Sequence, residues 1–501
     1  MAIRLGPLPS SNCMLLLYSR RVRPRAGGSQ SGTLTRGRAC RGARHVAHSV
    51  NADVLVIGAG VAGLAAAREL SQAGRTVALL DARGRIGGRV YTLHDPAWGL
   101  PVELGAEFLH GAANDTMRVA RAARLMVDRL PDHHYYARAG TLATNRDFWS
   151  TVSRVGKDIA RKLARSKAGD FSVAEYLERA ELPSDVRQLL IGFVEGYHAA
   201  HLDRISARVL VEGDGETGDG EPGGGNRQAR IAGGYDSVPR WMLDGLDPER
   251  ARLRLNTVVK ELVWKRGDVR ARCGTATGAE LPDIRARAAV IAVPHAILKA
   301  GALRLTPRVP ALDHAVARLE VGQIFKILLR FRESFWEEDG FIRERLRERR
   351  AEPAELNFVH GELTAVPTWW TALPSHTPRL TGWAGGPRAE ALLDQDEGAQ
   401  LSQSLDALAQ ILQVPRRLLD QQLEAWAVHD WRGDPWSLGA YTYPAIGGQN
   451  ASRTLARPIG DTLFLAGEAT VAEEVGTVSG AIGSGRRAAK AVLARLSKSR
   501  R

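Results

Sequence analysis

The sequence of 501 residues predicts an α/β fold in which one domain is assembled from three separate stretches of chain and joined to a mixed α+β domain with a helical part. Three apolar runs predict it, at residues 53–57, 288–293 and 462–466. The first and third lead into glycine-rich turns that open helical stretches. Short β-branched runs bounded by glycine are typical of buried parallel strands. We therefore expect one sheet to receive strands from all three stretches.

The first of these turns contains Gly58, Gly60 and Gly63. The first glycine permits a tight turn, the second lets backbone amides approach a pyrophosphate, and the third lets the helix pack on the strand. Asp81 ends the next strand-like run, twenty-three positions after Gly58, near the expected distance for a ribose hydroxyl. The pattern predicts a Rossmann-type dinucleotide site and leaves NAD or FAD open; the alternative is an ordinary glycine turn.

Composition and charge narrow the functional classes. The chain is 44% hydrophobic and carries a net charge of +14. Nine arginines and no acidic residue fall within residues 1–50, so the rest has 60 basic and 55 acidic residues. Its basic character belongs mostly to that leader, and we expect no nucleic-acid partner.

The leader, residues 1–50, is predicted to be disordered. Its composition fits an organellar transit peptide, but an in-frame upstream extension from a GC-rich gene is favoured, so a cytoplasmic location is expected. No run approaches eighteen apolar residues, which predicts no membrane span. Three cysteines, two of them in the leader, provide neither a disulfide framework nor a metal site.

The expected organisation has six parts. They are the leader 1–50, the cofactor domain in segments 52–111, 233–304 and 457–497, the helical part of the substrate domain at 112–232, and its mixed sheet and helices at 305–456. Residues 212–228 are predicted to be a polar surface loop. Helices are expected around 117–126, 155–163, 173–177, 186–194, 341–352 and 400–419.

A series of further motifs extends along the chain. In order they are Arg85–Arg89, Glu103–Gly111, Gly322–Lys326, Trp431–Trp436, Gly439–Tyr441 and Ala466–Thr470. With the glycine turn, this series resembles the flavin amine oxidase family, which includes polyamine and spermine oxidases, monoamine oxidases and lysine-specific histone demethylases. The resemblance covers roughly residues 52–497 and implies FAD as the cofactor.

The resemblance implies a set of cofactor-binding residues. On the adenosine side, Asp81 would contact the ribose, where the family usually has Glu, and Val259 would hold the adenine. In the middle, Arg83, Gly88 and Arg89 would flank the pyrophosphate and ribityl chain, and Glu468 would anchor the ribityl and phosphate side. At the flavin, the backbone of Glu107 and Phe108 would lie along the ring, and Thr477 and Val478 would direct N–H groups at it. The alternative for each is a turn or core residue. Ala440 stands where monoamine oxidases attach the flavin through cysteine, so non-covalent binding is implied.

Lys326 is the strongest catalytic candidate. It lies within the apolar run 324–329, where a lysine has no structural reason to be buried, although it could extend to solvent from an edge strand. In the family this lysine holds a water at the reactive flavin nitrogen. Tyr441 matches one wall of the family's aromatic cage, while Trp436 or Phe108 is expected to supply the second surface because Thr477 replaces the other tyrosine.

Three further residues are candidates for the substrate chamber. His110 matches the histidine of animal polyamine and spermine oxidases and could accept a hydrogen bond from a distal amino group, or it could simply be satisfied by the backbone. Glu195 and His198 lie on a helix that would roof the chamber, with a surface helix as the alternative.

The implied activity is oxidation of a primary or secondary amine, with a polyamine or a monoamine both allowed. Hydride passes to the flavin, the imine hydrolyses to an aldehyde, and dioxygen is reduced to hydrogen peroxide. The alternatives are an amino-acid oxidase, for which no arginine clamp can be placed, a desaturase-like dehydrogenase, a chromatin-type demethylase, and a flavin-bound interaction protein without turnover. The sequence does not specify the electron acceptor or the oligomeric state.

Overall fold

The computed structural model describes residues 50–111, 114–131, 133–138, 140–144, 148–166, 169–212, 228–347, 355–361 and 363–498. The predictions for the leader before residue 50 and for the polar loop between 212 and 228 lie outside these ranges. Within them, no helix is both long and apolar enough to cross a lipid bilayer.

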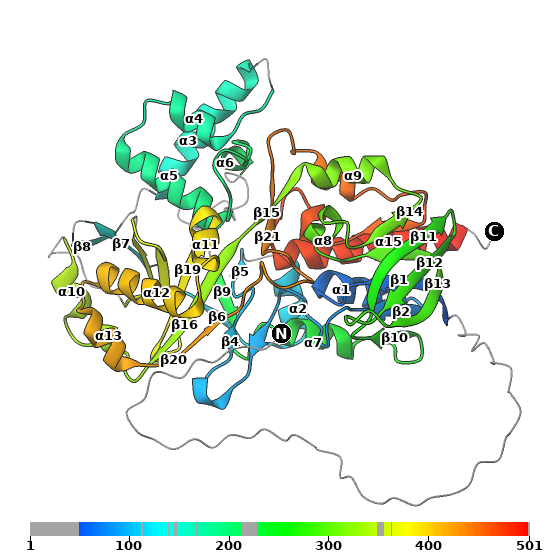
Figure 1. Ribbon diagram of the computed structural model, residues 1–501, viewed down its shortest axis with the longest axis horizontal. Helices are drawn as coiled ribbons and strands as arrows, with labels where there is room; N and C mark the ends of the chain where they lie inside the picture. The colour runs from blue at the N-terminus through cyan, green and yellow to red at the C-terminus, as the bar shows by residue number, and fades with distance from the viewer. Residues whose placement is uncertain are drawn as a thin grey trace, which may run out of the picture.

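The first sheet has eight strands in the order β10-β2-β1-β13-β12-β11-β14, with β22 beside β13. Its strands are β1 (Val50–Ile57), β2 (Val77–Leu80), β10 (Ala251–Arg254), β11 (Val258–Lys265), β12 (Asp268–Gly274), β13 (Glu280–Ile291), β14 (Arg304–Thr306) and β22 (Leu463–Leu465). β1 pairs in parallel with β2 and β13, and β22 adds in parallel to β13. Strands from distant stretches therefore form one sheet, as the sequence predicts (Figure 1).

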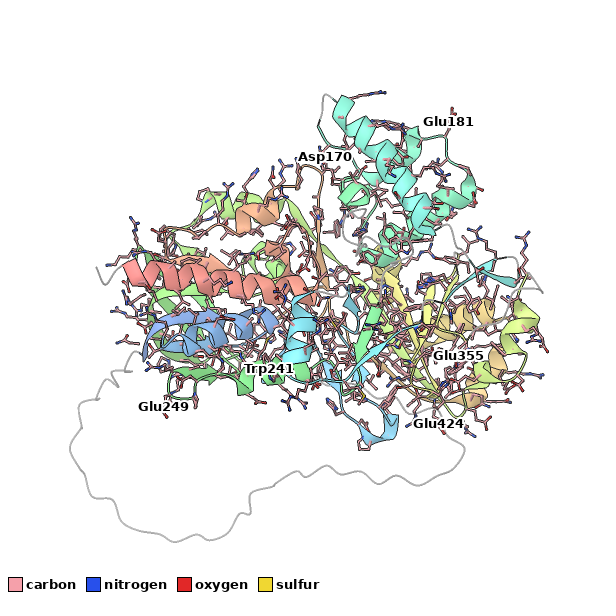
Figure 2. The ribbon with its side chains drawn as sticks, turned by 180° about the vertical axis from the view of Figure 1, so that it is seen from behind. Asp170, Glu181, Trp241, Glu249, Glu355 and Glu424 are labelled. Carbon is pink, nitrogen blue, oxygen red and sulfur yellow. The ribbon has the colours of Figure 1, made fainter. Side chains whose placement is uncertain are left out.

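Both faces of this sheet are buried at β1, β2, β22 and the end of β13, which explains the uninterrupted apolar runs there. Val54 and Val56 pack with α1 (Val61–Gln72) and α15 (Val478–Lys498), and Figure 2 shows these two helices side by side. Leu55 and Ile57 point to the opposite face. That face is covered by residues of three short helices, α8 (His295–Lys299), α9 (Pro310–Ala317) and α14 (Ala451–Leu455).

The second sheet has the order β20-β16-β19-β18-β17-β7-β8. Its strands are β7 (His134–Arg138), β8 (Thr141–Thr144), β16 (Ile324–Phe331), β17 (Phe358–Gly361), β18 (Thr368–Thr371), β19 (Arg379–Gly385) and β20 (Leu423–Val428). Phe325, Ile327 and Leu329 pack in one core with α11 (Gly386–Leu393), α12 (Glu397–Leu412) and α13 (Arg416–Gln422). Because side chains alternate along a strand, Lys326 points to the other face.

A group of helices stands at the top of Figure 1. It contains α3 (Phe148–Arg165), α4 (Val173–Arg179), α5 (Ser184–Tyr197) and α6 (Val209–Glu212), which share one apolar core. The remaining helices are α2 (Asp115–Ala122), α7 (Ser237–Asp244), α10 (Phe341–Arg345) and the short 3-10 turns η1 (Pro96–Trp98), η2 (Phe335–Glu337) and η3 (Glu468–Thr470). Short strand pairings complete the fold: β3 (Thr92–Leu93) with β4 (Val102–Glu103), β15 (Leu319–Gly322) with β21 (Tyr441–Pro444), and β5 (Leu109–His110) and β6 (Val127–Arg129) on either side of β9 (Gln228–Ile231).

Several predicted elements differ from the structure. The region 112–232 is not mainly helical throughout, because it supplies β6, β7, β8 and β9, and β7 and β8 complete the second sheet. The helix expected at 117–126 ends at Ala122, and the one expected from 341 ends at Arg345. The run 400–419 is two helices, since Gln413 adopts a left-handed conformation and Pro415 cannot continue a helix.

Candidate active site

The glycine turn forms a tight cradle at the end of β1. Gly58 has a φ of +103°, and a Cβ there would meet the carbonyl oxygen of Ala292 at 2.6 Å. A Cβ on Gly63 would meet the carbonyl oxygen of Gly58 at 1.8 Å. At Gly60 the nearest atoms would be 4.0 Å away, so its surface is open to a ligand at the start of α1. The free N–H groups of a helix N-terminus suit a phosphate, and the cradle fits a dinucleotide.

Asp81 stabilises the glycine turn by hydrogen bonds to backbone N–H groups. Its Oδ2 accepts a hydrogen bond from the N–H of Ala59 at 2.7 Å, and its Oδ1 accepts one from the N–H of Arg83 at 2.8 Å. Burial raises the pKa of Asp81, while these two backbone donors oppose the rise. Asp81 therefore orders the glycine turn. Each of its oxygens keeps a lone pair, so the predicted contact with a ribose hydroxyl is still possible.

The predicted arginines border the same cavity but are held by protein partners. Arg83 donates to Asp434 at 2.9 Å and to Ser437 at 2.7 Å. Arg89 donates to Glu468 at 3.0 Å and to the carbonyl of Ala440. Both guanidinium groups therefore lie beside the cradle, each already paired with a carboxylate.

The segment that carries Gly88 lies against the glycine turn. A Cβ on Gly88 would meet the Cα of Gly60 at 3.3 Å, and the φ of Gly88 is +61°. Val259 lies beside a bulge of β11 and lines the cavity. The structure therefore brings these two predicted contacts to the same cavity as Gly58 and Asp81.

The predictions for the terminal segment need two corrections. Glu468 is buried, and its carboxylate accepts hydrogen bonds from Arg89, Thr442 and the N–H of Gly476, so its oxygens are engaged by the protein. The N–H of Thr477 donates to the carbonyl of Glu474 instead of pointing at a ligand, and its hydroxyl accepts from the N–H of Gly480. Thr477 thus caps α15, which leaves Val478 and the helix dipole for the predicted role.

Lys326 is buried, with 2% of its surface exposed, which excludes an edge-strand lysine that extends to solvent. Its Nζ donates to Oε2 of Glu107 at 2.7 Å and to the carbonyl of Gly105 at 3.1 Å. The expectation that nothing structural accounts for a buried lysine here is therefore wrong. Glu107 contributes a buried carboxylate, and not only the predicted backbone contact.

Glu107 joins two cations. Its Oε1 accepts hydrogen bonds from Arg230 at 2.8 Å and from the indole N–H of Trp370 at 3.0 Å. Burial alone would raise the pKa of Glu107, but the charges of Lys326 and Arg230 and the hydrogen bonds from Lys326 and Trp370 outweigh it and lower the pKa to about 2. The carboxylate is therefore ionised throughout the physiological range.

Aromatic side chains enclose the space beyond Lys326. Tyr441 donates its hydroxyl to the carbonyl of Tyr197 at 2.8 Å, and burial raises the pKa of Tyr441. Phe108 contacts Trp370 with ring centroids 5.4 Å apart. Trp383 lies directly across the β16–β19 pairing from Lys326 and packs in the cluster that includes Ala440 and Tyr441.

Trp436 lines the same cavity as Tyr441. Its backbone N–H donates to Asp434, the partner of Arg83, which places its backbone beside the arginine side of the cradle. Phe108 and Trp383 also line the cavity, and Trp383 packs against the same small cluster as Tyr441. The second aromatic surface therefore has three candidates, of which Trp436 and Phe108 were predicted from the sequence.

The roof of the chamber comes from α5. The ring of His110 lies 6.3 Å from that of Tyr197, so His110 borders the chamber as predicted. Glu195 is paired with Arg388 at 3.1 Å, and burial lowers the pKa of His198 to about 4. Both line the cavity, so α5 is not a plain surface helix.

One continuous cavity of about 2390 Å³ joins these groups, from the glycine cradle past Lys326 and Tyr441 to Phe148 and Trp149 on α3. Sequence reasoning missed several of its residues, among them His134, Phe358, His360, Trp370 and Trp383. It also missed Arg230, which binds Glu107 but does not line this cavity. The weak signal for Arg230 is a charged residue inside the apolar alternation of 228–231. No cluster of three or more His, Cys, Asp or Glu able to hold a metal occurs in the part of the chain that the structure describes.

The fold and the cavity define a class of protein: an oxidoreductase with a dinucleotide cradle, assembled from distant segments, that opens into an aromatic chamber. Residues 61–493 match the family model described as flavin containing amine oxidoreductase, and the chain belongs to that family. It is therefore a flavin-dependent oxidoreductase acting on CH–NH groups.

The relatives cover nearly the whole chain. Polyamine oxidase 3 of Oryza sativa subsp. japonica is 30% identical over 89% of this chain and 90% of its own length. Flavin-containing amine oxidase B of Bos taurus is 24% identical over 90% of this chain and 88% of its own. Among solved structures, cyclohexylamine oxidase from Brevibacterium oxydans IH-35A aligns with a TM-score of 0.73 and 21% identity over 89% of this chain and 99% of that one, which confirms the fold.

Proposed function

We propose that this protein oxidises a primary or secondary amine with bound FAD as the acceptor, and passes the electrons to dioxygen. In the overall reaction, amine, O2 and water give aldehyde, the released amine or ammonia, and H2O2. The observation that carries the proposal is the continuity of one cavity from the glycine cradle to Lys326 and Tyr441. A cofactor held at one end thus meets a substrate held at the other.

FAD, held without a covalent bond, is the cofactor that these residues support. Gly58, Gly60 and Gly63 accommodate the pyrophosphate, with Asp81 at the ribose. Ala440 has no side-chain atom that could bond to a flavin, which supports non-covalent binding. When bound, FAD accepts a hydride from the substrate carbon and later transfers two electrons to O2.

The protein's own contribution is to hold a deprotonated amine in a dry chamber. Tyr441, Trp370 and Trp383 offer apolar ring surface, and Tyr441 is fixed by its hydrogen bond to Tyr197. An ammonium is a poor hydride donor, so excluding water favours the reactive neutral amine. Lys326, held by Glu107, places an ammonium group where a water molecule and a proton can be positioned.

The chamber gives less support to an amino-acid oxidase. Such an enzyme needs an arginine that is available to a substrate carboxylate. Arg388, which lines the chamber, is bound to Glu195, and Arg230, which lies outside the cavity lining, is bound to Glu107. Both guanidinium groups therefore already have carboxylate partners.

The test is a product balance on the purified protein. Incubation with a panel of mono-, di- and polyamines should consume one O2 for each aldehyde and each H2O2 formed, and acid denaturation should release intact FAD into the filtrate. Flavin that stays with the precipitate would overturn non-covalent binding. A flavin-containing protein that forms aldehyde only with an artificial acceptor would be a dehydrogenase instead.

A further inference from the structure

The floor of the substrate chamber is a row of side chains from residues that lie directly opposite one another on neighbouring strands of the second sheet. Neighbouring strands pair Lys326 with Trp383, Trp383 with Thr368, Thr368 with His360, and His360 with Tyr136. All five side chains line the cavity. Four strand spacings of about 4.8 Å place Tyr136 roughly 19 Å from Lys326. The chamber is therefore long in one direction.

Four stacked rings form the far end of this floor. The centroids of Phe358 and His134 are 4.6 Å apart, those of His134 and His360 5.3 Å, and those of His360 and Tyr136 4.8 Å. The corresponding ring planes differ by 5°, 4° and 24°. All four residues line the cavity, so the stack presents a continuous aromatic surface to it.

The two imidazoles are joined by a hydrogen bond. Nδ1 of His134 lies 3.0 Å from Nε2 of His360, and Nδ1 of His360 lies 3.3 Å from the hydroxyl of Thr368. A hydrogen bond between two ring nitrogens needs one N–H and one lone pair, so the tautomers are complementary. Burial, with a smaller contribution from His134, lowers the pKa of His360 to about 3. This end of the chamber carries no charge from His360 at neutral pH.

Two carboxylates in the described part of the chamber lining are already committed to cations. Glu107 is shared by Lys326 and Arg230, and Glu195 is bound to Arg388. A second ammonium group brought to the stacked rings would lose water without gaining either of these carboxylates. An alkyl or aryl tail would instead gain contact area.

We infer that the stacked rings Phe358, His134, His360 and Tyr136 form a subsite for the uncharged tail of an extended monoamine whose reacting amino group lies at the Lys326 end. The inference rests on the proposed amine oxidation and narrows its substrate class from amines in general to long monoamines. His360 is the specificity-determining residue, because it stands in the row that leads from Lys326 and contacts both neighbouring rings.

Paired substrates of equal length test the subsite. Butylamine, decylamine and 1,10-decanediamine are mixed anaerobically with the holoenzyme, and the concentration dependence of flavin reduction gives Kd and the limiting rate separately. Decylamine should bind at least about tenfold more tightly than butylamine, since it buries six more methylene groups, and at least about tenfold more tightly than the diamine. Equal Kd values for decylamine and the diamine in the unmodified protein would overturn the inference.

Substitutions at His360 sharpen the test. His360→Glu should reverse the preference toward the diamine, whereas His360→Phe should keep the stack and leave Kd for decylamine within about threefold. The matched control is His314→Glu, an exposed position on α9 outside the cavity, which should change nothing. An unchanged ratio of the two Kd values in a flavin-loaded His360→Glu variant would overturn the role of His360. Failure of every amine to reduce the flavin would instead refute the proposed function itself.

Discussion

Nζ of Lys326 lies 2.7 Å from Oε2 of Glu107, and this contact joins the second sheet to the segment that runs along the predicted cofactor site. Only 2% of the lysine side chain and 10% of the glutamate side chain are exposed. Arg230 binds the other oxygen of the same carboxylate. The lysine expected at the flavin is therefore part of a compensated charge network, with Glu107 as its positioning residue.

Replacing Glu107 by Gln should destabilise the protein strongly. The change leaves Lys326 and Arg230 buried without an anion, and breaking a buried pair in this way costs about 3–5 kcal/mol. Urea unfolding at neutral pH measures the loss. The same substitution at Glu473, whose pair with Arg453 is mostly exposed, should cost less than about 1 kcal/mol. Similar losses in the two variants would show that the buried network does not stabilise the fold.

Lys326→Met should bind FAD and yet reoxidise slowly. Glu107 keeps Arg230 and Trp370 as donors in this variant, so the site should remain folded. Loss of a positioned proton donor should slow the reaction of reduced flavin with O2 by about a hundredfold. Stopped-flow mixing of the reduced variant with oxygenated buffer measures that step alone. Lys299→Met, at a lysine paired with Glu320 outside the cavity, is the control. Reoxidation at the unmodified rate would remove Lys326 from the mechanism.

Two alanine substitutions in the glycine cradle should behave differently. Gly60→Ala meets no protein atom closer than 4.0 Å, so the thermal unfolding midpoint of the cofactor-free protein should hold while FAD affinity falls at least about tenfold. Gly63→Ala forces a Cβ to within 1.8 Å of the Gly58 carbonyl oxygen, so it should lower both the unfolding midpoint and the FAD affinity. Calorimetry of the cofactor-free protein and FAD titration separate the two effects. Undiminished FAD affinity in Gly60→Ala would place the phosphates elsewhere.

Glu103 should make stability depend on pH near neutrality. Burial raises its pKa to about 7, against hydrogen bonds from the N–H of Tyr235 and the hydroxyl of Thr92 that lower it. The folded-state pKa of Glu103 lies above the unfolded value of 4.5. The contribution of protonated Glu103 to the free energy of unfolding is therefore fully present below pH 4.5 and is lost as the pH rises through 7. The loss amounts to about 3 kcal/mol.

Glu103→Gln cannot ionise and should lack this decline. Urea unfolding of both proteins between pH 4.5 and 8 should therefore give curves that diverge as the pH rises, with the unmodified protein losing stability relative to the variant. Parallel curves would mean that Glu103 does not titrate in this interval.

Local patterns predicted the parts of the fold that are buried on both faces. Residues 54–57 and 288–291 are apolar throughout because helices cover both sides of the first sheet there, and the glycine turn needs its glycines for close approach and for the positive φ of Gly58. Strands β7 and β8 were missed because they lie at one end of the second sheet, where most side chains are only partly buried and the periodicity is weak.

The site was predictable one residue at a time but not as a network. A lysine inside an apolar strand marked Lys326, yet its partner Glu107 is 219 residues away and Arg230 lies on a third segment. The contact between His134 and His360 spans 226 residues and depends on the parallel pairing of β7 with β17, which no local pattern indicates. Trp383 was missed for the same reason, because its place beside Lys326 depends on the pairing of β16 with β19.

The most direct test of the account is anaerobic mixing of the purified protein with amines while flavin absorbance is followed. The account predicts a flavin-coloured protein whose absorbance bleaches with a rate that saturates as amine concentration rises, and recovers when oxygen is admitted. A colourless protein, or a flavin that no amine in a panel of mono-, di- and polyamines bleaches, would contradict it.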